Sequence, residues 1–432
     1  MSPLRYAGES ALTDPAAIDL FLRATHAGVL DFTWAVLCPL CSSFLTTAAG
    51  LRSLTERKRC SLCQADVALT DDAVEIAFTV SEPVRKLRIS DPETIDFQKN
   101  WMLHQFSRSA VPDREHAEIF KRPPIASRRL GPGETWTLEV TLEPKRYAVI
   151  APVNHATAHF EARAPGGASE VEVHFAAGYF VPEEIAVHPG KAKIQFHNRG
   201  DRPMVMGFLH DPVPEAPANR AHLKSIPVVR LPYLTGKRLV TSQTFRELFR
   251  AESMPSQDGL QFKSLTLLFT DLKGSTEMYE RVGDFKAFAL VREHFRVLRD
   301  LVAENGGAVV KTIGDAIMAS FAEPAPAVAA AARMRDEVRR VGEGGALELK
   351  LGLHAGPCIA VESNERLDYF GQTVNIAARV QGVASANEIA CTDAVFDAPG
   401  VGDAIRAAKL SAADDRAVLK GVDGVVKLHR LR

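Results

Sequence analysis

Two aspartates stand where an apolar strand gives way to a glycine turn. Asp271 follows the stretch 265–270, which is typical of a buried strand, and Asp315 follows Gly314 between two further apolar stretches. The second pattern predicts a tight hairpin with Asp315 at its tip. If these strands are neighbours in one sheet, both carboxylates lie at one edge, where they can hold one or two Mg²⁺ ions against the phosphates of a nucleotide. Alternatively, an aspartate beside a glycine serves the turn alone.

A third group of polar residues lies in DYFGQTVNIAARV, residues 368–380. Asp368 precedes Gly371 by three residues, and Asn375 and Arg379 lie four residues apart, so they share one face of the expected helix. Most other residues of this helix are apolar, and polar side chains are costly to leave unpaired in such surroundings. The alternative without chemistry is a solvated Asn375 and an Arg379 paired with a surface carboxylate.

Four of the six cysteines form two close pairs, Cys38 with Cys41 (CPLC) and Cys60 with Cys63 (CSLC), separated by 18 residues. This spacing is typical of a tetrathiolate zinc ribbon. Because four protein ligands leave no open position, Zn²⁺ held here is expected to be structural. A redox dithiol and free thiols are the alternatives.

Three stretches, LLFTDLKGST, KTIGDAIMASF and DYFGQTVNIAAR, resemble in this order the catalytic signature of the class III adenylyl and guanylyl cyclases. The resemblance covers residues 261–432 and implies a ferredoxin-like βαββαβ domain that works as a homodimer, with its sites between protomers. It implies an adenylate cyclase that converts ATP to 3′,5′-cyclic AMP and pyrophosphate, using two Mg²⁺ or Mn²⁺ ions per site.

By this resemblance, Asp271 and Asp315 are the two metal-binding aspartates. Asn375 matches the residue that orients the ribose, and Arg379 matches the residue that stabilises charge on the phosphates in the transition state. Family geometry implies that the aspartates come from one protomer and that Asn375, Arg379 and the purine-recognising residues come from the other. Because one chain carries both sets, a symmetric homodimer is expected to have two complete sites.

Lys311 and Asp368 match the pair that recognises the purine in adenylyl cyclases, where guanylyl cyclases carry Glu and a small residue such as Cys or Ser. Adenine offers a donor at its 6-amino group and an acceptor at N1, so an aspartate can accept from the first and a lysine can donate to the second. Guanine presents the reverse polarity, so the pair favours ATP. Lys420, in VLKGVDG, resembles a C-terminal lysine that contacts the terminal phosphates.

The alternatives to this function are a guanylate cyclase, which Lys311 and Asp368 disfavour, and a catalytically silent signalling scaffold. Intact metal-binding and transition-state residues argue against the scaffold. A diguanylate cyclase is expected to carry a Gly-Gly-Asp-Glu-Phe-like hairpin, whereas this hairpin is Ile-Gly-Asp-Ala.

The elements that must position these residues alternate between strands and helices, which predicts an α+β domain at the C-terminus. We expect a strand at 264–270, a helix at about 284–304, a hairpin at 308–321, a helix at about 325–341, a strand at 347–354 and a helix at 371–384. Upstream, residues 134–210 alternate as strands between turn residues, a pattern typical of a small β-sandwich or barrel.

The predicted domain organisation has four parts. They are an N-terminal helical segment with the zinc ribbon at 1–75, a β-rich, β-sandwich-like regulatory or interaction region at 76–235, a linker helix at 236–260 and the catalytic domain at 261–432. The region upstream of the catalytic domain also resembles, more loosely, a bacterial cyclase-associated domain of unknown function. We expect it to meet a regulatory ligand or protein whose identity the sequence does not give.

Composition bears on whether the protein binds nucleic acid or membranes. The 432 residues carry a net charge of −1, which gives no argument for a nucleic-acid or membrane-surface partner. The N-terminus lacks the features of a signal peptide, and no apolar run approaches the roughly 20 residues needed to span a bilayer. We therefore expect a cytoplasmic protein.

Overall fold

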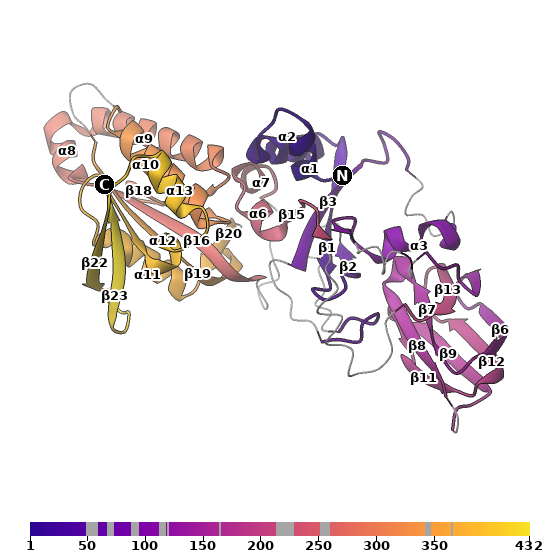
Figure 1. Cartoon of the computed structure of the whole chain (residues 1–432). Helices are drawn as coiled ribbons and strands as arrows, with labels where there is room; N and C mark the ends of the chain where they lie inside the picture. Colours follow the sequence, from indigo (N-terminus) through magenta and orange to yellow (C-terminus); the bar gives the residue numbers. More distant parts are fainter. Residues whose placement is uncertain are drawn as a thin grey trace.

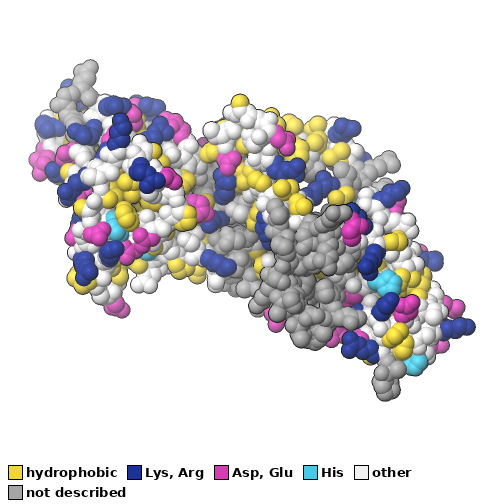
Figure 2. Space-filling view, viewed as in Figure 1, with side chains coloured by type: hydrophobic (Ala, Val, Ile, Leu, Met, Phe, Trp, Pro, Cys, Tyr) yellow, Lys and Arg dark blue, Asp and Glu magenta, His cyan; other side chains and the backbone are white. Residues whose placement is uncertain are grey.

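The chain folds into three consecutive parts in the computed structural model (Figure 1). The C-terminal domain lies at the left of the view, an N-terminal unit in the middle and a β-rich middle unit at the right. The described residues are 1–48, 59–66, 73–87, 95–111, 118, 121–163, 166–212, 229–250, 260–341, 347–363 and 366–432. Within these ranges, none of the helices has both the length and the apolar character needed to cross a membrane. Figure 2 shows cationic and anionic side chains interspersed over the visible face.

The N-terminal unit is a sheet with helices on one face. The strand order is β15-β3-β1-β2, with antiparallel neighbours. Alternate residues of β1, including Phe32 and Trp34, are buried in a cluster with residues of α2 and α7. Its elements are α1 (Pro3–Glu9), α2 (Asp14–His26), β1 (Leu30–Leu37), β2 (Phe44–Ala48), β3 (Val74–Val80), β15 (Leu234–Thr235), α6 (Gly236–Val240) and α7 (Gln243–Leu248).

This unit is not contiguous in the sequence. The strand β3 pairs with β1, and β15 returns after the whole middle unit to pair with β3. The boundaries predicted at 75/76 and 235/236 therefore fall inside one folded unit. The predicted linker helix at 236–260 is two short helices, α6 and α7, in its described part, and its residues 251–259 lie outside the described residues.

The middle unit consists of two sheets that share one apolar core. Their strand orders are β10-β9-β12-β6 and β11-β8-β7-β13-β5. Phe160 of β8 meets Phe196 of β12 edge to face across the core, with ring centroids 6.2 Å apart. The strands are β5 (Ala126–Leu130), β6 (Thr135–Leu142), β7 (Arg146–Ala151), β8 (Ala156–Ala162), β9 (Glu170–Ala176), β10 (Tyr179–Val181), β11 (Glu184–Val187), β12 (Gly190–Asn198) and β13 (Met204–His210). The helical turn η4 (Pro152–Asn154) follows β7, and α3 (Phe97–Gln105) and the pair β4 (Ala110–Val111) with β14 (Val229–Arg230) lie outside the two sheets.

The C-terminal domain is built on one large sheet of order β17-β18-β16-β19-β21-β23-β22, with β20 paired to β19. Its first half, β16-α9-β17-β18-α10-β19, has the βαββαβ order that the resemblance implies. The elements are β16 (Leu260–Leu272), α8 (Ser275–Val282), α9 (Asp284–Glu304), β17 (Ala308–Ile313), β18 (Ala316–Phe321), α10 (Pro324–Val338), β19 (Leu349–Ser363), β20 (Arg366–Phe370), α11 (Gln372–Gly382), β21 (Glu388–Thr392), α12 (Asp393–Phe396), α13 (Val401–Ala407), β22 (Ala412–Val418) and β23 (Val425–Leu431). The strand predicted at 347–354 continues to residue 363, and the other predicted elements form within a few residues of the expected positions.

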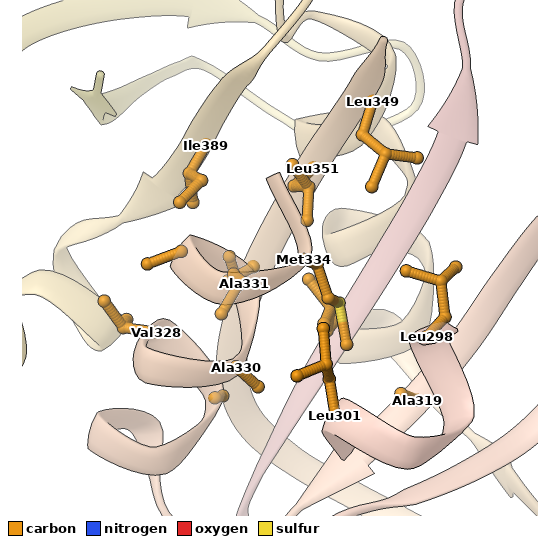
Figure 3. Close-up of a cluster of buried hydrophobic side chains, with 14 of the residues drawn as sticks. Leu298, Leu301, Ala319, Val328, Ala330, Ala331, Met334, Leu349, Leu351 and Ile389 are labelled. Carbon is orange, nitrogen blue, oxygen red and sulfur yellow. The ribbon is translucent and has the colours of Figure 1, made fainter. Parts of the chain in front are cut away.

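The two faces of this sheet are covered differently. Helices α9 and α10 bury one face; in Figure 3, Leu298, Leu301 and Met334 from these helices meet Leu351 and Ala319 of the sheet. The strand β16 alternates, so that Leu268 and Leu272 join this core whereas Leu267 and Phe269 point to the other face, together with Ala377 of α11.

Close packing of α11 on the sheet depends on Gly352 of β19. A Cβ atom on Gly352 would lie 2.1 Å from the backbone nitrogen of Gln381. A larger residue there would push α11 away from the strand, and with it the polar residues that this helix carries.

Candidate functional site

The two predicted metal-binding aspartates lie at the same end of the C-terminal sheet, at the ends of neighbouring strands. Asp271 belongs to the end of β16, on the face that α11 covers, and Asp315 lies in the turn between β17 and β18. Ile313 pairs with Ala316, so Gly314 and Asp315 form a two-residue hairpin turn, as predicted. Gly314 has φ +63°, a left-handed conformation that glycine adopts without strain.

The electrostatics of the aspartates suit a cation. Burial and the charge of Asp315 raise the pKa of Asp271, against the opposing influence of Lys350 and a hydrogen bond from Gln381. The Oδ2 atom of Asp315 is buried and has no hydrogen-bond partner among the described residues. Repulsion between the two carboxylates and a buried oxygen without a hydrogen bond both destabilise the fold, unless a cation binds between them. The donor set, carboxylate oxygens alone, fits Mg²⁺ or Mn²⁺.

His294 contacts the backbone of this turn. The sequence did not lead us to predict this residue. It is fully buried in α9, and its Nε2 atom lies 3.3 Å from the backbone oxygen of Asp315. Burial lowers the pKa of His294 to about 4, so the neutral ring can donate from Nε2 to this carbonyl. The available signal was its position: His294 lies three residues after Val291 and four before Leu298, on the apolar face of the helix.

Lys311 and Asp368, 57 residues apart in sequence, are brought together. The Nζ atom of Lys311 lies 2.7 Å from Oδ2 of Asp368, with side-chain exposures of 43% and 12%. The other carboxylate oxygen of Asp368 accepts a hydrogen bond from the backbone N–H of Tyr369 at 2.8 Å. The carboxylate is therefore fixed by its own strand, whereas the lysine head remains accessible.

Asn375 and Arg379 lie one turn apart on α11, and both are exposed. Neither side chain has an ion-pair or hydrogen-bond partner within the ranges that the structure describes. They are thus available to a ligand or to a second chain, and the structure does not bring them into contact with Lys311 or Asp315. Lys420 is exposed in the turn between β22 and β23 and makes no ion pair with the other predicted site residues.

The four paired cysteines form a second candidate site, between the N-terminal and middle units. Their Sγ atoms all lie within 4.8 Å of one another; Cys38 and Cys63 are 3.6 Å apart, and Cys41 and Cys60 are 3.7 Å apart. A tetrahedral ion with Zn–S bonds of about 2.3 Å requires sulfur atoms about 3.8 Å apart. The observed separations match this requirement.

Both cysteine pairs also have the same backbone turn. The N–H of the first cysteine donates to the carbonyl five residues later, from Cys38 to Ser43 and from Cys60 to Ala65, at 2.9 Å in each case. The residue after the second cysteine has positive φ, 59° at Ser42 and 54° at Gln64. Two matching turns thus direct four thiols toward one point, and this geometry suits a tetrathiolate metal.

The cysteine site is fastened to the middle unit by His159. This buried residue of β8 places Nε2 2.8 Å from the backbone oxygen of Ser61 and Nδ1 2.8 Å from Oδ2 of Asp211. Arg146 adds an ion pair to the same carboxylate at 3.3 Å. The turn that carries Cys60 and Cys63 is therefore part of the contact between the N-terminal and middle units.

Comparison with known proteins finds two family matches. Residues 1–247, more than half of the chain, match a family of unknown function, DUF5939, and residues 259–400 match the adenylate and guanylate cyclase catalytic domain. The second match covers Asp271, Asp315, Lys311, Asp368 and the α11 pair.

Individual relatives each match part of this chain. A serine/threonine-protein kinase, pkn2 of Myxococcus xanthus, is 31% identical over 137 residues, 31% of this chain and 16% of that protein. The pH-sensitive adenylate cyclase MT1302 of Mycobacterium tuberculosis is 31% identical over 170 residues, 39% of this chain and 41% of that protein. The crystal structure of the adenylyl cyclase CyaB from P. aeruginosa is 22% identical, with a TM-score of 0.36, over 40% of this chain and 96% of that one. The chain thus spans less than half the length of these curated relatives.

Proposed function

Because the chain belongs to the DUF5939 family and carries a class III nucleotidyl cyclase domain of the adenylate cyclase type, we propose that it converts ATP to 3′,5′-cyclic AMP and pyrophosphate at sites shared between two copies of the chain. One observation carries the choice of chemistry: Asp271 and Asp315 lie close enough for one charge to raise the pKa of the other, and Asp315 keeps a buried oxygen unpartnered. This pair suits a bound divalent cation.

In the reaction, the ribose 3′ oxygen forms a bond to the α-phosphorus, and the bond between the α-phosphorus and the oxygen that bridges it to the β-phosphate breaks. Pyrophosphate leaves, and the proton of the 3′ hydroxyl passes to solvent. Two Mg²⁺ or Mn²⁺ ions would supply positive charge that lowers the pKa of the 3′ hydroxyl and neutralises the leaving group. Asp271 and Asp315 would hold these ions, Arg379 would stabilise charge on the phosphates, and Asn375 would orient the ribose.

The preference for ATP rests on Lys311 and Asp368. Asp368 is nearly buried and fixed by the N–H of Tyr369, so it can accept from the 6-amino group of adenine at a defined position. Lys311 can turn from Asp368 to donate to N1. A guanine in the same place would set its O6 against the carboxylate and its N1 hydrogen against the ammonium, which leaves buried polar groups unpaired.

The exposure of Asn375 and Arg379 on α11 supports a site that is shared between two chains. Asn375 and Arg379 have no hydrogen-bond or ion-pair partner in the described part of their own chain, which leaves both side chains available to a second chain. We propose that the aspartates of one protomer and the α11 residues of the other complete each site, with Lys420 contacting the terminal phosphates.

We also propose that Cys38, Cys41, Cys60 and Cys63 bind one structural Zn²⁺. The sulfur separations and the two matching turns support this assignment. The ion would hold the turn of Cys60 and Cys63 against the middle unit, where a regulatory ligand or protein could act.

The experiment that tests the function is a turnover assay of the full chain with ATP and GTP, each with Mg²⁺ or Mn²⁺. The proposal predicts cyclic AMP formation, with kcat/KM for ATP exceeding that for GTP by about 10²-fold or more. A dimeric protein that forms no cyclic nucleotide, or that prefers GTP, would contradict it.

A further inference from the structure

The short helix α7 touches both strands that carry the Lys311–Asp368 pair. The Oε1 atom of Gln243 accepts a hydrogen bond at 2.8 Å from the backbone N–H of Val309, two residues before Lys311 on β17. Three residues along the helix, Nη2 of Arg246 donates to the backbone oxygen of Leu367, directly before Asp368 on β20. One helix therefore ties the two strands to each other.

Arg246 also holds β20 on the other side of Asp368. Its guanidinium lies over the ring of Tyr369, 5.8 Å from the centroid. Tyr369 is buried, its backbone N–H fixes the Asp368 carboxylate, and its hydroxyl lies 3.5 Å from the backbone oxygen of Val240, just before α7. The residues before and after Asp368 are thus both attached to the segment 240–246.

The opposite face of α7 belongs to the core of the N-terminal unit. Phe245 is buried, and the centroid of its ring lies 6.1 Å from that of Trp34. Phe249, directly after the helix, meets Phe32 edge to face at 5.2 Å. Because Phe32, Trp34 and Phe245 are buried in one cluster, a movement of α7 relative to β1 would disrupt these contacts.

We propose that α7 is a positioning element for purine recognition, in which Gln243 and Arg246 fix the distance between β17 and β20 and so set the preference for adenine over guanine. The inference rests on the proposed function, because it assumes that Lys311 and Asp368 read the base. Both residues hydrogen-bond to the backbone of the strands that carry the pair. Such contacts matter because a hydrogen-bonding site loses discrimination when its groups are misplaced by as little as about 1 Å. A ligand that shifts the N-terminal sheet would reach the base through the same helix.

Arginine is suited to this position by its shape. A planar guanidinium can donate from its edge to the carbonyl of Leu367 while its face lies on Tyr369. A lysine at position 246 can make one of these contacts but not both. Arg246→Lys is therefore a graded variant that keeps the charge and loses part of the geometry.

The test compares Arg246→Ala, Arg246→Lys and Gln243→Ala with the wild type in the full chain. Arg299→Ala is the matched control, because Arg299 lines the same pocket, is 56% exposed and pairs with Glu247 of α7. Within the described residues it makes no hydrogen bond or ion pair with β17 or β20. For Arg246→Ala we expect kcat/KM for ATP to fall about tenfold, mainly through KM, and the ATP to GTP ratio to fall by a similar factor. The ratio should be intermediate in Arg246→Lys and unchanged in Arg299→Ala.

A second readout separates this inference from the proposed function. Dissociation constants for ATP and GTP, measured by calorimetry with Ca²⁺ in place of Mg²⁺, give the base preference whether or not turnover occurs. An unchanged ATP to GTP ratio in soluble, dimeric Arg246→Ala overturns the inference even if turnover drops. If Arg246→Ala does not fold, an unchanged ratio in both Arg246→Lys and Gln243→Ala overturns it. Absence of cyclic AMP formation by the wild type, with the binding ratios behaving as expected, counts against the function and not against the positioning role.

Discussion

The Nζ atom of Lys311 lies 2.7 Å from Oδ2 of Asp368, so the two side chains assigned to the purine already pair with each other. The ammonium end of this pair is 43% exposed, so solvent screens the attraction between the two charges. Opening it to admit a base therefore costs little. The pair keeps the carboxylate and the ammonium at the site, and adenine can replace each partner with a hydrogen bond of matching polarity.

Replacing both residues of this pair tests how the base is recognised. Lys311→Glu combined with Asp368→Cys removes both adenine contacts and offers guanine an acceptor, so we expect a large loss of ATP turnover and a small gain with GTP. The measurement is kcat/KM for both nucleotides, whose ratio gives the discrimination energy. The same chemical changes at two exposed positions away from the site, Asp403→Cys on α13 and Lys409→Glu shortly after it, provide the control. If the ratio is unaltered in the double variant, this pair does not read the base.

The metal assignment predicts opposite effects of one substitution on activity and on metal-free stability. Asp271→Asn should lower kcat by about 10²-fold or more, because a metal ligand is lost. The raised pKa of Asp271 means that the folded protein disfavours the ionised carboxylate. The protonated carboxyl therefore contributes stability that is fully present below the pKa of the unfolded state, and this stability is lost as the pH rises through the pKa of the folded state. At pH 7 the metal-free variant should therefore have a higher Tm than the metal-free wild type.

Added Mg²⁺ should raise the Tm of the wild type and leave that of Asp271→Asn nearly unchanged. Thermal unfolding with and without Mg²⁺ gives both comparisons. An equal Mg²⁺-dependent shift in the two proteins would remove Asp271 from the metal site.

His294 predicts a pH dependence of stability. Its folded pKa of about 4 lies below the unfolded value near 6.5, so the neutral ring stabilises the fold above pH 6.5 and this stability is lost as pH falls from 6.5 towards 4. His294→Gln keeps an N–H donor and cannot titrate. Between pH 6.5 and 5, the free energy of unfolding should fall less steeply in the variant, by up to about 1.4 kcal/mol per pH unit. Denaturant titrations at several pH values measure this slope, and parallel slopes would contradict the role assigned to His294.

The cysteine site predicts about one Zn²⁺ per chain. Cys38→Ser and Cys60→Ser should lose the ion and destabilise the contact between the N-terminal and middle units, since metal binding is coupled to folding. Cys358→Ala is the control, because Cys358 is a buried core cysteine of the C-terminal domain. Metal analysis and limited proteolysis give the readouts. Zinc retained at wild-type stoichiometry in Cys60→Ser, or protein purified without chelator that contains none, would refute the assignment.

The local features of the catalytic domain could be predicted from the sequence because they depend on residues that are close together in the chain. The helix at 284–304 forms where its apolar periodicity predicts it, and the Gly314–Asp315 turn closes the hairpin in the expected register. The ion pair of Lys311 with Asp368 is different: spacing alone gave no reason to join residues 57 positions apart, and only the family resemblance did so.

What the sequence could not give depends on tertiary contacts. His294 and Gln381 meet Asp315 and Asp271 only after α9 and α11 have packed on the sheet. The boundary predicted at residue 75 falls inside a sheet because β15 pairs with β3 across more than 150 residues, and such non-local pairing leaves no local signal. The contacts of α7 with β17 and β20 were hidden for the same reason.

The central claim, that ATP is cyclised at a site shared by two chains, is tested most directly by complementation. Asp271→Ala disables the metal-binding half of each site and Asn375→Ala disables the other half, so each variant alone should be inactive. After equimolar mixing and exchange, half of the dimers are heterodimers, each with one intact site of two, and cyclic AMP formation should recover to about a quarter of the wild-type rate. No recovery, under conditions where labelled chains demonstrably exchange, would contradict the shared site.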